Sequence, residues 1–319
     1  MSRRVSREKS RKSHGTVEAH QQFFTPSEVA KEVADLAVKY GPKKGAVYLE
    51  SCAGDGAILS HLPKGHRRAN ELDPKMCCVL RKRFPDTPIR CRDFLTYRTK
   101  VAKDKLVVVT NPPYRGGWRQ AAGKDIMWAI IEHAMSLADT GVFLLPAGAR
   151  RMCATSKHLK DRHIHLVHEK TWKEGVPFRY GESVKPIRVV IRVYKRKTSL
   201  RPLCEIPKID PSTFHILPRH EMSKANLYML NWGSVATIGQ LFTGRDLKSA
   251  RKRFKRPDHA VPFKATGKNL ASLMTLLTKR RPIIQAYASR IASGNNPYLA
   301  RSELLAILDL GQGVKKLYD

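Results

Sequence analysis

The chain has 319 residues, of which 42% are hydrophobic, and carries a formal net charge of +33 with a pI near 10.3. That apolar content excludes a wholly disordered chain and suffices for one large domain or two modest ones. The excess of lysine and arginine favours a polyanionic partner, above all nucleic acid, over an anionic membrane surface.

Two further features of the sequence bear on where the protein works. No apolar run reaches the length of a membrane span, and no apolar segment follows the basic N-terminus as it would in a secretory signal. The six cysteines show no CxxC pair, which favours a reducing compartment over a disulfide framework or a zinc finger. We therefore expect an intracellular protein, cytoplasmic or, in a eukaryote, nuclear, without membrane association.

The N-terminal region has two parts. Residues 1–20 are basic and nearly free of large apolar side chains, so we expect a disordered arm that either contacts phosphates or is simply solvated. The segment "FFTPSEVAKEVADLAVKYGP" is typical of a helix. We expect Thr25 as its N-cap, Pro26 in its first turn and Glu28 to complete a capping box.

From residue 46 the chain alternates strand and helix patterns. Strand patterns within residues 46–56, 67–74, 89–95, 105–114, 141–149 and 186–196 enclose helical patterns at 57–62, 75–84 and 125–139. Repeated units of this kind predict an α/β fold with an open, largely parallel sheet and helices on both faces. In such a sheet, ligands bind at the carboxyl ends of the strands.

The pattern changes after Thr198. Four prolines punctuate an irregular stretch, residues 245–259 are strongly basic, and residues 269–291 and 302–310 have helical spacing. We expect three regions: the arm at 1–20, an α/β domain at 21–198, and a basic, partly helical C-terminal region at 199–319 that is a candidate for recognising a nucleic-acid target.

Three successive predicted strands end in acidic residues. Glu50 precedes the glycine turn that contains Gly54, and Glu71 ends the next strand. A carboxylate in the second position commonly holds a ribose diol. Asp93 and Phe94 follow the third strand, where an acid beside an aromatic ring suits an adenine. Each alone is typical of an ordinary solvated loop, but the three together predict a nucleoside-containing cofactor.

The motif "NPPY" ends the fourth strand. Methylation of an exocyclic amine is favoured when two acceptors bind both amine hydrogens and localise the nitrogen lone pair. The side-chain oxygen of Asn111 and the carbonyl of Pro112 can do this, and the prolines hold them rigidly. Tyr114 offers a face on which a planar base can stack.

In this order, "FFTPSEVA", "YLESCAGDG", "NELDP", "RDFL" and "VVVTNPPY" resemble the S-adenosylmethionine-dependent N6-adenine DNA methyltransferases, especially those of TaqI type. The resemblance covers residues 22–197 and implies a Rossmann-like class I methyltransferase fold with a seven-stranded sheet. For the cofactor, it implies that Thr25 and Pro26 contact the methionine moiety and that Glu50, Ala53, Gly54 and Asn111 line the binding site. It further implies that Glu71 holds the ribose and that Asp93 and Phe94 hold the adenine. For the target base, it implies a site formed by Asn111, Pro112 and Tyr114.

The family also places an aromatic residue before its late strand, beside the extruded base. Phe178 is the candidate here, with Tyr180 and Trp172 as alternatives. Ser51 stands where many members carry proline. The region beyond Thr198 matches no pattern that we can place.

We therefore expect methyl transfer from S-adenosylmethionine to N6 of adenine in nucleic acid, DNA favoured, by base extrusion and direct displacement. Three alternatives stay open: adenine methylation of RNA, methylation of a protein glutamine, and a basic binding protein on an inactive methyltransferase fold. The charge argues against a protein substrate, and the intact motifs argue against an inactive fold.

Two other motifs look less informative. His163, His165 and His168 lie close together, but no cysteine or second cluster accompanies them, so we expect a basic, partly exposed strand and no metal site. The stretch "NNPYLA" at 295–300 repeats part of the NPPY motif without a preceding strand, and we expect a turn there.

Overall fold

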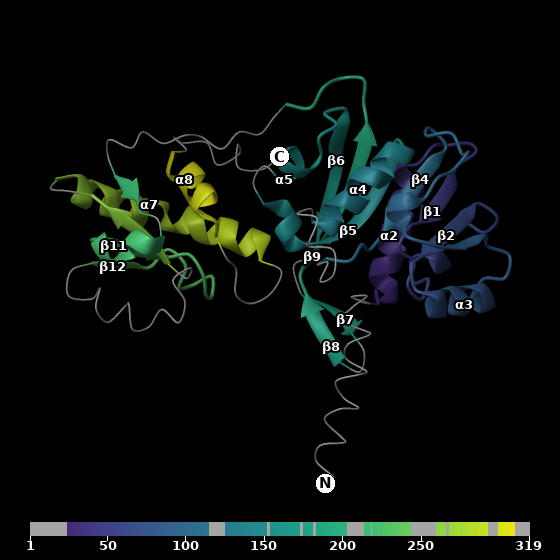
Figure 1. The fold of residues 1–319 in the computed structure, drawn as a ribbon, viewed down its shortest axis with the longest axis horizontal. Coiled ribbons are helices and arrows are strands. Elements are labelled where there is room, and N and C mark those ends of the chain that lie inside the picture. The colour runs from purple at the N-terminus through teal and green to yellow at the C-terminus, as the bar shows by residue number, and fades with distance from the viewer. Residues whose placement is uncertain are drawn as a thin grey trace, which may run out of the picture. The chain divides into compact units, whose positions relative to one another are not determined.

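The computed structural model describes residues 24–114, 125–151, 154–172, 175–180, 183–202, 214–217, 219–243, 260–265, 268–292 and 299–309 (Figure 1). The chain divides into two compact units. Unit 1 comprises Met1–Pro146 and Thr155–Pro202, and unit 2 comprises Ala147–Ala154 and Leu203–Asp319. The predicted arm at 1–20 and the basic segment at 245–259 lie outside the described residues.

Unit 1 is built on a seven-stranded sheet. Its strands are β1 (Val47–Glu50), β2 (Arg67–Glu71), β3 (Ile89–Cys91), β4 (Leu106–Thr110), β5 (Thr140–Pro146), β6 (Ile164–Thr171) and β9 (Val189–Arg196). Their order is β3-β2-β1-β4-β5-β9-β6, and the pairs from β3 to β5 are parallel while β9 runs antiparallel to both neighbours. The predicted α/β fold with a mainly parallel, seven-stranded sheet is confirmed.

The central strands are buried on both faces, which is why β4 is a continuous apolar run, "LVVV", before Thr110. Side chains alternate between the faces, and on one face Val107 and Val109 pack in the same cluster as the apolar side of α2 (Ser27–Tyr40). The other face is covered too, since Val108 is equally buried. α4 (Ile126–Leu137), which contacts β4 and β5, provides this second layer.

Two helix predictions need correction. α2 begins at Ser27 with Pro26 as its N-cap and has no side-chain cap, so Thr25 does not cap the helix. Its hydroxyl instead accepts a hydrogen bond from the amide of Asn111. The helix expected at 57–62 is only a short 3₁₀ turn, η1 (Leu59–His61), because Pro63 follows at once and ends it.

Other elements of unit 1 follow local signals. α3 (Pro74–Arg83) starts with Pro74 behind Asp73, whose carboxylate accepts from the backbone N–H of Lys75 at 2.9 Å. α4 is capped in the same way by Asp125. The structure also contains η2 (Phe94–Thr96), η4 (Ala147–Arg150) and α5 (Ala154–His158).

A hairpin that the sequence analysis did not predict precedes β9. It consists of β7 (Val176–Tyr180) and β8 (Ser183–Ile187), which pair antiparallel with each other and stand apart from the large sheet (Figure 1). Backbone pairing between Phe24 and Arg179 attaches the N-terminal segment to it. The alternation of Val176, Phe178 and Tyr180 before Gly181 was the local signal for this hairpin.

Within its described residues, unit 2 contains a smaller antiparallel sheet and two α-helices. The sheet has the order β10 (His215–Ile216), β13 (Ala260–Lys264), β11 (Leu227–Leu230) and β12 (Leu241–Thr243). It is accompanied by η5 (Arg219–Lys224), α7 (Lys268–Ile291) and α8 (Arg301–Asp309). The two predicted C-terminal helices are confirmed, whereas the sheet was not expected. In the described part of the chain, no helix combines the length and apolarity needed to cross a membrane.

Candidate active site at the carboxyl edge of the sheet

The candidate site lies where β1, β2, β3 and β4 end, which we call the carboxyl edge. These four strands are neighbours in the order β3-β2-β1-β4, so their terminal loops meet at one edge of the sheet. Each loop carries one of the predicted polar motifs. The parallel pairing thus places Glu50, Glu71, Asp93 and Asn111 at the same edge, although 61 residues of sequence separate the first from the last.

The glycines after β1 have different roles. Gly54 has a φ of +53°, and a Cβ built on it would meet nothing within 4 Å. Gly56 has a φ of +79°, but a Cβ there would lie 2.5 Å from the ring of Phe84 and 2.8 Å from Leu80. Gly56 is therefore required for packing against α3. Gly54 leaves an open space in which a ligand can approach the backbone closely.

The side chain of Glu50 lies on the core side of this turn. Its side chain is only 2% exposed, and Oε2 accepts from the backbone N–H of Leu59 at 2.7 Å. Burial raises the pKa of this carboxyl well above its ordinary value, although the bond from Leu59 opposes the shift. In this structure Glu50 organises the turn from the core side, and a direct contact with the cofactor stays a prediction.

Glu71 connects the turns after β1 and β2. Its Oε2 accepts from the N–H of Gly54 at 2.7 Å, and its Oε1 accepts from the N–H groups of Leu72 and Asp73 at 2.8 and 2.9 Å. Bonds to three backbone donors hold the carboxylate rigidly beside Gly54. An open space beside Gly54 and a fixed carboxylate next to it are what a ribose diol and a close backbone approach would need, and the binding of S-adenosylmethionine here stays a prediction.

Asn70 is a site residue that the sequence analysis missed. Its side chain is 1% exposed, and Nδ2 donates to the backbone oxygens of Ser51 at 3.1 Å and Arg92 at 3.0 Å. The amide thereby ties the end of β1 to the end of β3 across β2. A polar residue at the last position before the acid of a buried strand was the available signal.

The third loop places Asp93 and Phe94 differently. The carboxylate of Asp93 accepts from the N–H of Leu95 at 3.1 Å and caps η2. The ring of Phe94 is only 4% exposed and packs against His133, with ring centroids 5.1 Å apart, and against Tyr97. Both residues lie at the carboxyl edge, next to Glu71. Stacking of Phe94 on an adenine stays a prediction, because its ring belongs to the core here.

The NPPY loop follows β4. Nδ2 of Asn111 donates to Oγ1 of Thr25 at 3.1 Å, across 86 residues of sequence. Pro112 is buried and Tyr114 is half-buried. Burial raises the pKa of the Tyr114 hydroxyl above its ordinary value. The structure thus brings the predicted methionine-contacting residue Thr25 directly against the predicted amine-binding residue Asn111.

The proposed stacking aromatics are not equivalent. Phe178 is completely buried in the core of unit 1, so its ring presents no face to solvent in this structure. Trp172 is partly buried against the same core. The side chain of Tyr180 lies outside the described set. Stacking of Phe178 on a target base would require its ring to be uncovered, and that role stays a prediction.

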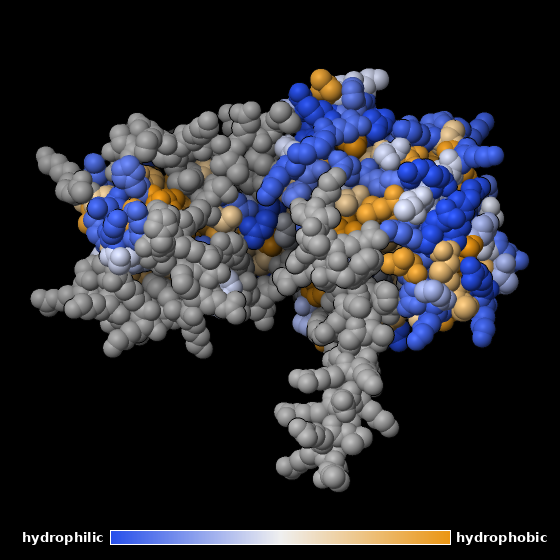
Figure 2. All heavy atoms as spheres, viewed as in Figure 1, coloured by the Kyte–Doolittle hydropathy of each residue, from blue (hydrophilic) through white to orange (hydrophobic). Residues whose placement is uncertain are grey.

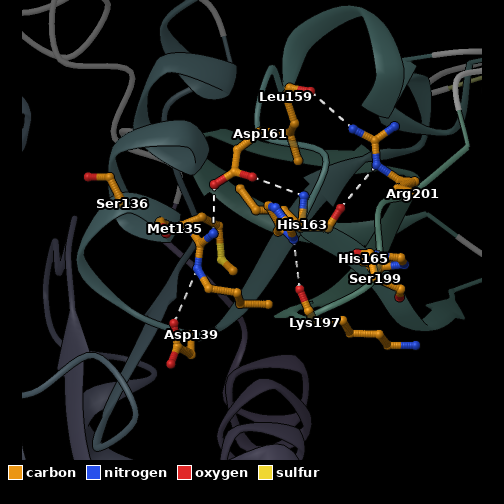
Figure 3. Close-up of polar contacts among 12 residues, drawn as sticks. Met135, Ser136, Asp139, Leu159, Asp161, His163, His165, Lys197, Ser199 and Arg201 are labelled. Carbon is orange, nitrogen blue, oxygen red and sulfur yellow. Dashed lines mark hydrogen bonds and ion pairs between the residues drawn. The ribbon is translucent and has the colours of Figure 1, made fainter.

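His165 and His168 lie on the partly exposed strand β6, as predicted, and His163 directly precedes it. Two of the rings bond to the chain that follows β9. Nδ1 of His163 bonds to the carbonyl of Lys197 at 3.1 Å, as the dashed line in Figure 3 shows, and Nε2 of His165 bonds to that of Ser199 at 2.9 Å. His168 stacks on Tyr40 with ring centroids 5.3 Å apart. The rings of His163 and His165 therefore contribute to anchoring the chain after β9, whereas that of His168 packs against α2.

No family model matches the chain, and no curated protein matches it. Solved structures are similar to part of the chain at low identity. A provisionally named RNA methyltransferase from Pyrococcus horikoshii is 18% identical over 56% of this chain and 87% of its own, with a TM-score of 0.44. A provisionally named class I S-adenosylmethionine-dependent methyltransferase from Listeria monocytogenes is 18% identical over 61% of this chain and 68% of its own, also with a TM-score of 0.44.

A third solved structure is the modification subunit of a provisionally named type I restriction enzyme from Vibrio vulnificus. It is 15% identical over 55% of this chain and 44% of its own, with a TM-score of 0.42. At these identities and scores, neither activity nor substrate transfers to this chain. The strand order, with its antiparallel β9, is by itself that of the Rossmann-like class I methyltransferase fold.

Proposed function

We propose that unit 1 transfers a methyl group from S-adenosylmethionine to N6 of adenine in nucleic acid, with DNA as the favoured polymer. The observation that carries the proposal is that two hydrogen-bonded pairs of residues lie at the ends of neighbouring strands. Glu71 is bonded to Gly54 at the ends of β2 and β1, and Asn111 is bonded to Thr25 beside the end of β4. The first pair is suited to bind the ribose of a nucleoside, and the second is suited to bind an amino group.

The chain's own residues would act by holding and orienting. When bound, S-adenosylmethionine supplies the methyl group, and its sulfur keeps the electron pair of the bond that breaks. Glu71 would hold the ribose diol beside Gly54. Asn111 Oδ1 and the Pro112 carbonyl would accept the two amine hydrogens and thereby localise the nitrogen lone pair for attack on the methyl carbon. The surplus proton would then leave the nitrogen for solvent.

The substrate class follows from charge and planarity. The net charge of +33 favours a polyanion and makes its binding steeply salt-dependent. Tyr114 adjoins the acceptor pair and offers a face for a planar base extruded from its strand or taken from a single strand. In Figure 2 the visible described surface of unit 1 is mainly hydrophilic, with separate smaller apolar areas, as suits a protein that binds a charged polymer.

The decisive experiment exposes the full chain to labelled S-adenosylmethionine with separate pools of DNA, RNA and protein. Mass spectrometry then identifies the modified nucleoside or residue. We expect N6-methyladenine in nucleic acid, with the largest amount in DNA, and none with the Asn111→Ala variant. Label on glutamine, or cofactor binding without any transfer to nucleic acid, would overturn the proposal. Label in RNA alone would replace DNA as the polymer while leaving the chemistry in place.

A further inference from the structure

The segment that precedes α2 contacts three separate elements of unit 1. The backbone N–H of Phe24 donates to the carbonyl of Arg179 on β7 at 3.0 Å. Thr25 Oγ1 accepts from Asn111 after β4. Ser27 Oγ lies 3.1 Å from Nε2 of His61 in η1, just after the glycine turn. Residues 24–27 therefore join the β7–β8 hairpin, the NPPY loop and η1, which follows the glycine turn.

Arg179 contacts two of these parts with one side chain. Its guanidinium lies over the ring of Phe24, 4.5 Å from the centroid, and Nη2 lies 3.6 Å from Oδ2 of Asp55 between the two glycines of the turn. The side chain is 61% exposed, so it is not held in place by the core. Its position is set by these two partners, one in the N-terminal segment and one in the glycine turn.

The contacts of Arg179 affect the orientation of the Asn111 amide through Thr25. Thr25 lies between Phe24, which Arg179 holds, and Pro26, which begins the helix. Because Thr25 Oγ1 accepts from Nδ2 of Asn111, the planar amide is held with its nitrogen towards Thr25 and its oxygen turned away from it. The location of Thr25 thus sets the orientation of the amide oxygen.

We propose that Arg179 is a positioning residue: by clamping Phe24 against β7 and tying it to Asp55, it places the Thr25 hydroxyl so that this hydroxyl orients the amide of Asn111. The kinetic part of this inference rests on the proposed function. Arg179 itself contacts neither methyl donor nor acceptor. Its loss should therefore lower the rate of transfer more than the affinity for the cofactor.

The first test needs no activity. Hydrogen–deuterium exchange, read by mass spectrometry on peptides that cover residues 22–30, reports how firmly the segment is held. In Arg179→Ala we expect exchange of these peptides to rise about three- to tenfold, since one exposed cation–π contact and one exposed ion pair are lost. The matched control is Arg81→Ala, which removes an exposed arginine on α3. Unchanged exchange in Arg179→Ala would overturn the proposal.

The second test is a double-mutant cycle on the transfer rate. Thr25→Val removes the acceptor at nearly constant shape, and we expect it and Arg179→Ala each to lower kcat about tenfold. Because Thr25 is itself predicted to contact the methionine moiety, the affinity readout applies to Arg179→Ala, for which calorimetry should show cofactor affinity changed by less than about twofold. If both act on the amide of Asn111, the double variant should be little worse than the poorer single variant. Losses that multiply to about a hundredfold would contradict the coupling.

Conservative variants separate positioning from folding. Thr25→Ser keeps the hydroxyl and should retain kcat within about threefold, and Arg179→Lys keeps the charge and should recover part of the loss. Equal melting temperatures of all variants would exclude unfolding as the cause. If the wild-type chain transfers no methyl group to any substrate, the proposed function fails, while the exchange experiment still decides whether Arg179 holds the segment.

Discussion

The two ends of the large sheet use polar residues in opposite ways. At the carboxyl edge, the side chains of Asn70 and Glu71 bond to backbone groups of neighbouring loops, and that of Glu50 bonds to the backbone of the segment that follows its own strand. All three side chains are mostly shielded from solvent. At the other end, which we call the amino edge, Arg196 bridges Asp139 at 3.3 Å and Asp161 at 2.7 Å, as the dashed lines around these acids in Figure 3 indicate. Those three side chains are about a third exposed.

This difference shows which polar residues shape the molecule. A buried carboxylate or amide that satisfies backbone donors or acceptors cannot be removed without leaving those groups unpaired, so each loop at the carboxyl edge depends on its partner. An exposed ion pair can be replaced by water with little loss. Changes at the carboxyl edge should therefore affect the site strongly, and changes at the amino edge should affect only stability, and only modestly.

The largest effect is expected for Asn111→Ala. If the proposed function holds, removing the amide deletes one of the two proposed acceptors for the amine, and loss of one such preorganised group typically lowers kcat by about 10²–10³. Cofactor affinity should stay within about twofold, because the glycine turn and Glu71 are unchanged. Single-turnover transfer and calorimetry measure the two quantities. Equal losses in transfer rate and in cofactor affinity would contradict the separate roles proposed for Asn111 and for the cofactor-binding residues.

The two glycines of the turn should separate stability from ligand affinity. Gly56→Ala places a methyl group against Phe84 and Leu80, and overpacking of this kind costs about 1–3 kcal/mol, to which the strain of its positive φ adds. Urea unfolding measures that loss. Gly54→Ala meets no protein atom and should cost less stability, but its methyl group enters the ligand space and should weaken S-adenosylmethionine binding.

The reverse pattern would be that Gly54→Ala is the less stable variant and Gly56→Ala binds S-adenosylmethionine more weakly. That result would show that the cofactor does not lie in the open space beside Gly54. Both variants require the same left-handed backbone conformation at the substituted position. The comparison between them therefore isolates what the added methyl group contacts.

The buried carboxyl of Glu50 predicts a specific pH dependence. Because burial raises its pKa in the folded state, the folded protein retains this proton at pH values where the unfolded chain has lost it. The stability contributed by Glu50 is therefore complete below the ordinary glutamate pKa and is lost as the pH rises through the folded-state value.

Glu50→Gln keeps an acceptor for Leu59 but does not titrate. Melting temperatures measured from pH 4 upward should fall more steeply for the wild type than for this variant. Parallel curves would contradict the assignment. Glu132→Gln, a partly exposed glutamate on α4, is a suitable control for the removal of one carboxylate.

The smallest effect is expected at the amino edge. Arg196→Ala should cost about 1 kcal/mol of stability and leave kcat and cofactor affinity unchanged. Although partial burial opposes it, the N–H of His163 and the guanidinium of Arg196 lower the pKa of Asp161. That stabilisation is present above the ordinary aspartate pKa and is lost as the pH falls through the lower folded-state value. A loss of activity in this variant would show that the two edges are coupled.

Local sequence patterns were sufficient for the sheet and its strand ends. The buried run before Asn111, the acids at Glu50 and Glu71 and the glycines between them identified β1, β2 and β4 and the edge where their loops meet. The periodicity of α2, α3, α4, α7 and α8 predicted those helices with bounds close to the observed ones. These features depend on neighbours within a few residues, so the sequence displays them directly.

What only the tertiary structure decided is how distant residues share the site. By sequence, Thr25 is a good helix cap, and nothing near it indicates that its hydroxyl bonds to Asn111, or that Phe24 lies beneath Arg179. Asn70 and the buried ring of Phe178 are further cases. Each depends on contacts between segments that are separated along the chain and brought together only by the order of strands in the sheet. The sequence by itself predicted which polar groups gather at the carboxyl edge, whereas the fold determined which residues hold those groups in place.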